Sequence, residues 1–123
     1  MPILDVDIVL EPGESLRPEL AGELADRVGE VFGAAPGTTW VKLRAIPAEH
    51  YAENQTDRPN DIYPVFMSVL KAKLSPLDER QREMTRLTEA VARVCRRPPE
   101  NVHILYLPEG AGRMAFGGTL VPD

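Results

Sequence analysis

Apolar and polar residues alternate at the start of the chain. In residues 2–10, PILDVDIVL, apolar side chains recur at every second position, which predicts a half-buried strand. Pro12 and Gly13 end this strand, because both residue types favour turns. From Ser15 to Phe32 the apolar spacing changes to three and four residues, which predicts a helix. Its apolar stripe consists of Leu16, Leu20, Leu24, Val28 and Val31.

This first helix carries residues suited to its two ends. Pro18 fits a first turn, where its missing N–H costs no hydrogen bond, and Gly33 supplies the stop. After a short turn, residues 38–46, TTWVKLRAI, are β-branched and aromatic and predict a second strand. One face of that strand carries Trp40, Lys42 and Arg44, and the other face carries Val41, Leu43 and Ala45.

The same order of elements returns after a polar stretch. Residues 47–62 contain two prolines and predict a long loop, and loops of this length commonly line a pocket or an interface. Residues 64–74 predict a third strand. Ser75 and Pro76 predict the start of a second helix, with Asp78 completing a capping-box-like pattern. The apolar stripe of this helix consists of Leu77, Met84, Leu87, Val91 and Val94.

The second helix ends at residues 96–101, RRPPEN, and residues 102–107, VHILYL, predict a fourth strand. The glycine-rich tail that follows predicts either a hairpin or a short strand that reaches another subunit. The two halves therefore repeat one strand–helix–strand order, and Pro2 and Pro64, 62 residues apart, each open a half.

This repeat predicts one α+β domain. Residues 1–47 form a first βαβ unit, residues 48–63 a connecting loop, and residues 64–123 a second βαβ unit with a C-terminal tail. One unit alone leaves its sheet face and helix stripe exposed. Two units together form a four-stranded mixed sheet with two helices on one face, with right-handed crossovers.

Composition narrows the function classes. The chain has 123 residues, 43% of them hydrophobic and 27% charged, which fits a single globular domain. Its net charge is −5 and no basic block occurs, so we expect no nucleic-acid partner. The apolar runs are too short to span a bilayer, and the first residues, with Asp5 and Asp7, do not resemble a signal peptide. We therefore expect a cytoplasmic protein without membrane contact.

Cysteine and histidine content predicts no metal site. Cys95 is the only cysteine, so no internal disulfide can form, and its position on the second helix predicts a half-buried, inert thiol. One cysteine and two separated histidines do not provide the ligand spacing of a structural zinc site.

Several features together resemble the tautomerase superfamily. They are Met1-Pro2 directly before the first strand, the duplicated βαβ plan, the segment PENVHILYL, and FGG at residues 116–118. This superfamily includes 4-oxalocrotonate tautomerase, macrophage migration inhibitory factor, malonate semialdehyde decarboxylase and the 3-chloroacrylic acid dehalogenases. The resemblance covers nearly the whole chain. It implies a tautomerase/MIF-like fold, no cofactor and a homotrimer, in which three sheets would enclose a shared core.

The resemblance also implies a catalytic role for Pro2. Once Met1 is removed, Pro2 carries a secondary amine, and an ordinary α-amino group titrates near pH ~8. Burial lowers that pKa, and a neutral amine near pH 7 is a competent general base. In the family such a base moves a proton on a small keto or enol acid. The alternative is a proline that only opens a strand. Pro64 lies inside the chain and has no free amine.

An anionic substrate calls for cations that bind its carboxylate and stabilise an enolate. Family members place basic residues near the end of the third strand, where Lys71 and Lys73 share one predicted strand face. Edge-strand lysines that oppose aggregation are the alternative interpretation. Lys42 and Arg44, on the second strand, and Arg113, in the tail, are further candidates for substrate binding.

Three more positions match the family's pocket. His103 stands, within one residue, where 4-oxalocrotonate tautomerase has an arginine, and it could donate to a carboxylate or be a structural histidine. Tyr106 and Phe116 resemble the pocket wall, with core packing as the alternative for each. Trp40 is expected in the core or at an interface. The loop residues that could cover the site are Glu49, His50 and Tyr51.

The chain also departs from the family. No arginine ends the first strand, where Pro12 and Gly13 stand instead, which argues against 4-oxalocrotonate as the substrate. We find no clear carboxylate placed to activate water, so dehalogenase or decarboxylase chemistry has no support. Two alternatives stay open: a non-catalytic tautomerase-fold protein, and a ferredoxin-like or dimeric α/β-barrel binding module in which Pro2 is incidental.

Overall fold

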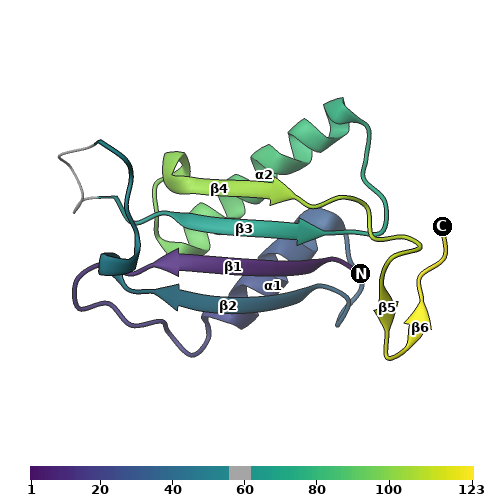
Figure 1. Cartoon of the computed structure of the whole chain (residues 1–123), viewed down its shortest axis with the longest axis horizontal. Helices are drawn as coiled ribbons and strands as arrows, with labels where there is room; N and C mark the ends of the chain where they lie inside the picture. The colour runs from purple at the N-terminus through teal and green to yellow at the C-terminus, as the bar shows by residue number, and fades with distance from the viewer. Residues whose placement is uncertain (56–61) are drawn as a thin grey trace.

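The computed structural model describes residues 1–55 and 62–123 and shows two layers, a four-stranded sheet and two helices that cover one of its faces (Figure 1). The first half contains β1 (Ile3–Val9), α1 (Leu20–Phe32), β2 (Trp40–Ile46) and a 3₁₀ turn (Ala48–His50). The second half contains β3 (Val65–Leu70), α2 (Leu77–Cys95), a 3₁₀ turn (Pro99–Asn101), β4 (Val102–Tyr106) and a hairpin of β5 (Ala115–Phe116) and β6 (Thr119–Leu120). Of the predicted loop at 47–62, residues 56–61 lie outside the described residues.

The strand order confirms the predicted mixed sheet. The order is β2-β1-β3-β4, with β1 parallel to β2, β3 parallel to β4, and β1 antiparallel to β3 at the centre. Each half is therefore a βαβ unit whose two strands are direct neighbours. In a ferredoxin-like split βαβ unit, another strand separates the parallel pair. The ferredoxin-like alternative is wrong for this sheet.

The hydrophobic core lies between the sheet and the helices, where the predicted stripes meet. Every second residue of β1 and β3 points toward the helices, and both helices bury their apolar faces against them. Leu77 is the exception to the predicted stripes, because this first residue of α2 remains 75% exposed. The fully buried side chains include Leu4, Val6, Ile8, Leu24, Val28, Met67, Leu87 and Val91.

The first helix starts later than predicted. α1 begins at Leu20 rather than Ser15, and Pro18 lies in a turn that precedes it. Gly33 ends the helix as predicted. Its φ of 62° lies in the left-handed region, and its N–H donates to the carbonyl of Glu30 at 3.1 Å.

The capping box predicted for the second helix is wrong. α2 begins at Leu77, and Pro76 precedes it without a side-chain cap. The backbone carbonyl of Ser75 instead accepts two hydrogen bonds from the Arg80 guanidinium, at 3.1 and 2.8 Å. The third strand is also shorter than predicted, because β3 ends at Leu70 rather than at residue 74.

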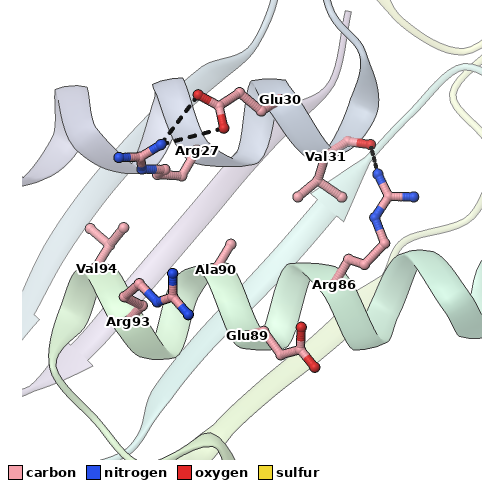
Figure 2. A pocket seen from close by; sticks show the side chains of 8 residues that line it. All are labelled: Arg27, Glu30, Val31, Arg86, Glu89, Ala90, Arg93 and Val94. Carbon is pink, nitrogen blue, oxygen red and sulfur yellow. Dashed lines mark hydrogen bonds and ion pairs between the residues drawn. The ribbon is translucent and has the colours of Figure 1, made fainter.

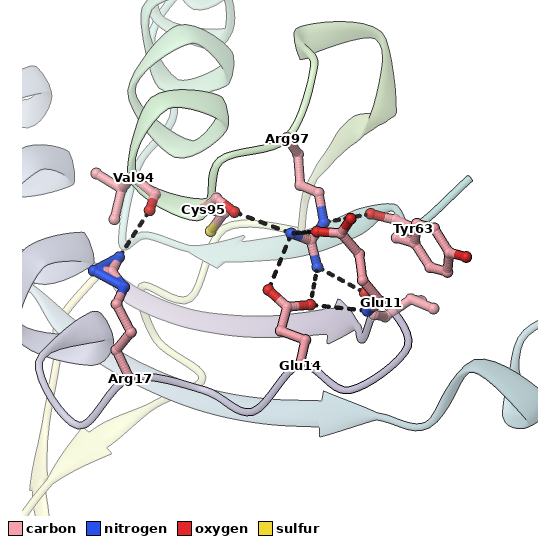
Figure 3. Close-up of polar contacts among 8 residues, drawn as sticks. Glu11, Glu14, Arg17, Tyr63, Val94, Cys95 and Arg97 are labelled. Carbon is pink, nitrogen blue, oxygen red and sulfur yellow. Dashed lines mark hydrogen bonds and ion pairs between the residues drawn. The ribbon is translucent and has the colours of Figure 1, made fainter. Parts of the chain in front are cut away.

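A buried arginine joins the two halves at one end of the sheet (Figure 3). The Arg97 side chain is 3% exposed, and its guanidinium donates to the carbonyl oxygens of Val9, at 2.9 Å, and Tyr63, at 2.8 Å. It also forms ion pairs with Glu14, at 2.7 Å, and Glu11, at 3.2 Å. The end of β1, the segment before β3 and the end of α2 are therefore held by one side chain.

The contacts with Arg97 change the pKa of the Glu14 carboxyl group. Burial by itself raises the Glu14 pKa, but the hydrogen bonds from Arg97 and from the Glu11 N–H, with the charge of Arg97, outweigh burial and lower the pKa. A carboxyl group with a lowered folded-state pKa stabilises the fold above its unfolded pKa.

We predict that Arg97→Met lowers the free energy of unfolding by about 3 kcal/mol, because the buried carbonyls and Glu14 lose their donor. The measurement is urea unfolding monitored by circular dichroism. Arg27→Met is the matched control, since the Arg27–Glu30 pair is 59% and 67% exposed. Its cost should stay below about 0.5 kcal/mol. Equal losses of stability in the two variants would contradict the proposed role of Arg97 in joining the two halves.

We also predict that the stability contributed by Glu14 is present above its unfolded pKa of about 4.3 and is lost as pH falls through the lower folded value. Chemical denaturation between pH 3 and pH 6 measures this loss. In Glu14→Gln the free energy of unfolding should fall less steeply as pH decreases than in the parent protein. An unchanged dependence on pH would show that Glu14 does not contribute to it.

Candidate active site

Pro2 occupies a buried position at the end of the sheet. Its carbonyl accepts a hydrogen bond from the N–H of Trp40 at 3.0 Å, so the proline is fixed at the beginning of both β1 and β2. Leu4 and Val6 point toward the helices, and the two-residue period of a strand places Pro2 on that same side. The Pro2 nitrogen is joined to Met1, which is 46% exposed.

The topology collects other chain segments at this end. β1 and β2 begin here, whereas β3 and β4 end here, and the C-terminal hairpin lies beside them (Figure 1). The tail continues the pairing past the strands, because the N–H of Gly110 donates to the carbonyl of Lys71 at 2.8 Å and that of Ala111 to Ala72 at 3.2 Å. The tail therefore keeps the chain after β3 beside the sheet end that contains Pro2.

Lys71 is the predicted cation that this arrangement brings to Pro2. Ile3 is opposite Leu70 in the antiparallel ladder, so the register continued by one residue sets Pro2 opposite Lys71. The Lys71 side chain is 21% exposed, and its Nζ lies 3.4 Å from Glu83 Oε2 and 4.9 Å from the centre of the Phe32 ring. Lys71 thus points to the helix side of the sheet, the side that Pro2 occupies.

Lys73 is placed differently. β3 ends at Leu70, so Lys71 and Lys73 follow the strand and do not share a strand face as predicted. The Lys73 side chain is exposed and has no hydrogen-bond or ion-pair partner among the residues that the structure describes.

Tyr106 joins the same group. Its hydroxyl donates to the Glu83 carboxylate in a short hydrogen bond. Burial, followed by the hydrogen bond and charge of Glu83, raises the pKa of Tyr106, so the phenol stays protonated near neutral pH. The Glu83 side chain is only 16% exposed, and it contacts both Tyr106 and Lys71.

Glu83 was missed by the sequence analysis, although the sequence carries a signal for it. Glu83 precedes Leu87 by four residues, and Leu87 precedes Val91 by four. A carboxylate on the buried face of α2 was therefore detectable from the helical period. Glu83 is a carboxylate that contacts Lys71 and Tyr106, whereas the sequence showed no carboxylate clearly placed to activate water.

Phe116 contacts Trp40, whose side chain lies on the sheet face opposite Pro2. Its ring meets the Trp40 ring edge-on, with centres 5.0 Å apart and planes at 86°. Trp40 remains 39% exposed, and its indole N–H donates to the carbonyl of Gly37 at 3.0 Å. The tail thus folds as the hairpin alternative within its own chain. Arg113 lies on the tail's turn with an exposed side chain.

Lys42 and Arg44 lie on the opposite face of the sheet from Pro2, as strand alternation requires. Lys42 Nζ is 3.2 Å from Asp5, and Arg44 Nε is 2.8 Å from Asp7. The buried Asp5 Oδ1 has ion-pair contacts but no well-aligned hydrogen bond. Both cations form ion pairs with aspartates of β1 and do not reach the Pro2 side of the sheet in their own chain.

His103 lies at the other end of the sheet. It is the second residue of β4, and its ring lies 5.4 Å from the Phe66 ring, which in turn lies 6.0 Å from Tyr51. The 3₁₀ turn with Glu49 and His50 follows β2 at this same end. Within one chain the structure therefore does not bring His103 or these loop residues to Pro2.

The helix layer contains a separate hollow (Figure 2). A groove of about 360 Å³ lies between α1 and α2 and includes Arg27, Arg86 and Arg93 in its lining. Arg27 pairs with Glu30 at 3.3 Å, and Arg86 donates to the carbonyl of Val31 at 2.7 Å. Two of the three arginines are thus engaged by the helices themselves.

Two further properties concern residues 1–55 and 62–123. No group of three histidine, cysteine, aspartate or glutamate side chains in these ranges is arranged to hold a metal ion, and none of their helices is long and apolar enough to cross a bilayer.

Cys95 is buried rather than half-buried, and burial raises the pKa of its thiol to about 11.

No protein-family model and no curated protein sequence matches the chain. Solved structures do match it. Pt0534 inactivated by 2-oxo-3-pentynoate is 18% identical, with a TM-score of 0.73, over 97% of this chain and 95% of that one. A fused 4-OT symmetric trimer is 15% identical, with a TM-score of 0.75, over 97% and 94% of the two chains. Macrophage migration inhibitory factor from Trichinella spiralis is 8% identical, with a TM-score of 0.71, over 96% and 98%. The chain therefore has the tautomerase/MIF-like fold that its sequence predicts.

Proposed function

We propose that this protein is a tautomerase in which the amine of Pro2, freed by removal of Met1, is the general base. The observation that carries the proposal is the burial of Pro2 at a sheet end where Lys71, Tyr106 and Glu83 lie on the same side. Burial favours the neutral amine, which is the form that accepts a proton.

The proposed reaction moves one proton. The neutral Pro2 amine takes a proton from the carbon next to a carbonyl group. The electron pair of the broken C–H bond forms a C=C bond, and the π pair of the carbonyl moves to its oxygen to give an enolate. The protonated amine then returns the proton to the oxygen or to a different carbon. The protonated Tyr106 hydroxyl and the Lys71 ammonium are the groups that would stabilise the enolate or hold a carboxylate.

A small keto or enol acid is the proposed substrate class. Pt0534, which shares this fold, is inactivated by 2-oxo-3-pentynoate, a keto acid. Lys71, Lys73 and Arg113 provide cations near the end of the sheet where Pro2 lies, so an acid could be held there despite the net charge of −5.

We further propose a homotrimer in which the open sheet faces meet. Apolar side chains on that face remain exposed in one chain, with Trp40 at 39%, Phe66 at 37% and Leu105 at 61%. The fused 4-OT structures that share the fold are trimers. In such an assembly Lys42, Arg44 and His103 would lie at subunit interfaces, where they could reach a neighbouring chain's site.

We predict that Pro2→Ala lowers kcat/KM for phenylpyruvate tautomerisation by about a hundredfold or more, as loss of a positioned base requires. The assay follows the enol absorbance, and mass spectrometry first establishes that Met1 is absent. Pro64→Ala is the matched control, since Pro64 opens the other half and has no amine; its activity should stay within a few-fold of the parent.

A second arm of this experiment leaves every side chain unchanged. Protein purified from a host that retains Met1 has an acylated Pro2 nitrogen and should be inactive, and removal of Met1 by an aminopeptidase should restore turnover. Undiminished activity in Pro2→Ala, or in the protein that retains Met1, would contradict the proposal that the Pro2 amine is the base.

We predict a solution mass of three times the 13.6 kDa of one chain, measured by size exclusion with light scattering. Leu105→Glu places a charge on the open sheet face and should shift the protein toward monomer. Leu77→Glu is the control, because Leu77 is 75% exposed on the helix side and should leave the mass unchanged. A dimer would contradict the proposed trimer.

A further inference from the structure

Among the residues that the structure describes, Glu83 contacts both Lys71 and Tyr106, the two candidate substrate-binding groups on the Pro2 side of the sheet. Its Oε2 lies 3.4 Å from Lys71 Nζ, and its Oε1 accepts the Tyr106 hydroxyl. The three side chains come from different elements: Glu83 from α2, Tyr106 from the end of β4, and Lys71 from the segment after β3. The tertiary fold therefore brings these three side chains into contact, since they are far apart in the sequence or lie on different elements.

We propose that Glu83 is a positioning residue that limits anion binding: its carboxylate is the internal partner of Lys71, and an anionic substrate has to replace it there. This inference rests on the proposed tautomerase function and deepens it by naming what sets the affinity for the substrate's carboxylate.

Charge and burial support the competition. The Lys71 and Glu83 side chains are 21% and 16% exposed, so their attraction is only partly screened by water. While the pair is intact, the net charge that it presents to an approaching carboxylate is zero. The Lys71 ammonium also lies 4.9 Å from the centre of the Phe32 ring, which attracts an ammonium group whether or not Glu83 is engaged. The lysine can therefore leave Glu83 without losing every partner.

Tyr106 keeps Glu83 in place during such an exchange. Its hydroxyl donates to the carboxylate, which leaves Glu83 with one hydrogen-bond donor after Lys71 moves away. The charge of Arg80, one turn before Glu83, lowers the pKa of Tyr106, and the Arg80 guanidinium is held by the Ser75 carbonyl. Glu83 therefore acts on both groups, because it adds to the effect of burial in raising the pKa of Tyr106 and it pairs with Lys71.

The test is Glu83→Gln, which keeps the shape and an acceptor oxygen but removes the charge. We expect KM for phenylpyruvate to fall about tenfold with kcat changed far less, since Lys71 no longer has an internal counter-ion. The affinity for phenylacetate, an unreactive carboxylate measured by calorimetry, should rise by a similar factor. Glu79→Gln is the matched control, because Glu79 is an exposed glutamate on the same helix; it should leave both values unchanged.

Two further variants assign the effect. In a Lys71→Met background, Glu83→Gln should no longer improve phenylacetate binding, which identifies Lys71 as the group that Glu83 restrains. Spectrophotometric titration should show the Tyr106 phenol ionising at lower pH in Glu83→Gln than in the parent, with Tyr106→Phe used to assign that transition.

The outcomes separate the two proposals. Phenylacetate binding that stays the same or weakens in Glu83→Gln overturns the role of Glu83, even if Pro2→Ala abolishes turnover. If Pro2→Ala leaves turnover unchanged, the tautomerase proposal fails, while the calorimetric and titration results still report whether Glu83 restrains Lys71 and Tyr106.

Discussion

The antiparallel pairing of β1 with β3 is the constraint on which the rest of the molecule depends. Each half supplies two parallel strands and one helix, and only this central ladder joins the halves into one sheet. The same ladder brings the end of β3 to the beginning of β1. Pro2, Lys71 and Tyr106 therefore lie at the same end of the sheet, because β3 and β4 run opposite to β1, although Pro2 and Tyr106 are 104 positions apart.

The elements could be predicted from the sequence because each has a clear period. Alternation in β1 and the three- and four-residue steps in the helices identify both element type and buried face. The starts of the helices were less predictable. Ser15 and Ser75 both have the side chain of an N-cap, yet α1 and α2 begin at Leu20 and Leu77. Neither helix start has a side-chain cap hydrogen bond, so these serines do not mark it.

The candidate site was predictable only in part, for a related reason. Pro2 and Lys71 stand at recognisable positions in the repeat, so their proximity follows from topology. The partner of Lys71 does not, since Glu83 reaches it from another layer of the fold. Arg97 is a stronger case: its partners Glu11 and Glu14 are 86 and 83 positions away, and an arginine beside two prolines only indicates the end of a helix. The local sequence predicts which face of a strand is buried, but it does not predict which distant residues form ion pairs.

The Arg97 cluster has a consequence for stoichiometry. The antiparallel centre of the sheet makes Pro64 the counterpart of Pro2, and the end of β1, beside Pro64, the counterpart of the end of β3. At the Pro64 end the Arg97 guanidinium and two carboxylates fill this place, held by the carbonyls of Val9 and Tyr63. Gene duplication would double the number of such ends per chain, but one of the two is closed by its own ion pairs. Under the proposed function, ligands bind at the Pro2 end, so a trimer would have three ligand sites among its six βαβ units.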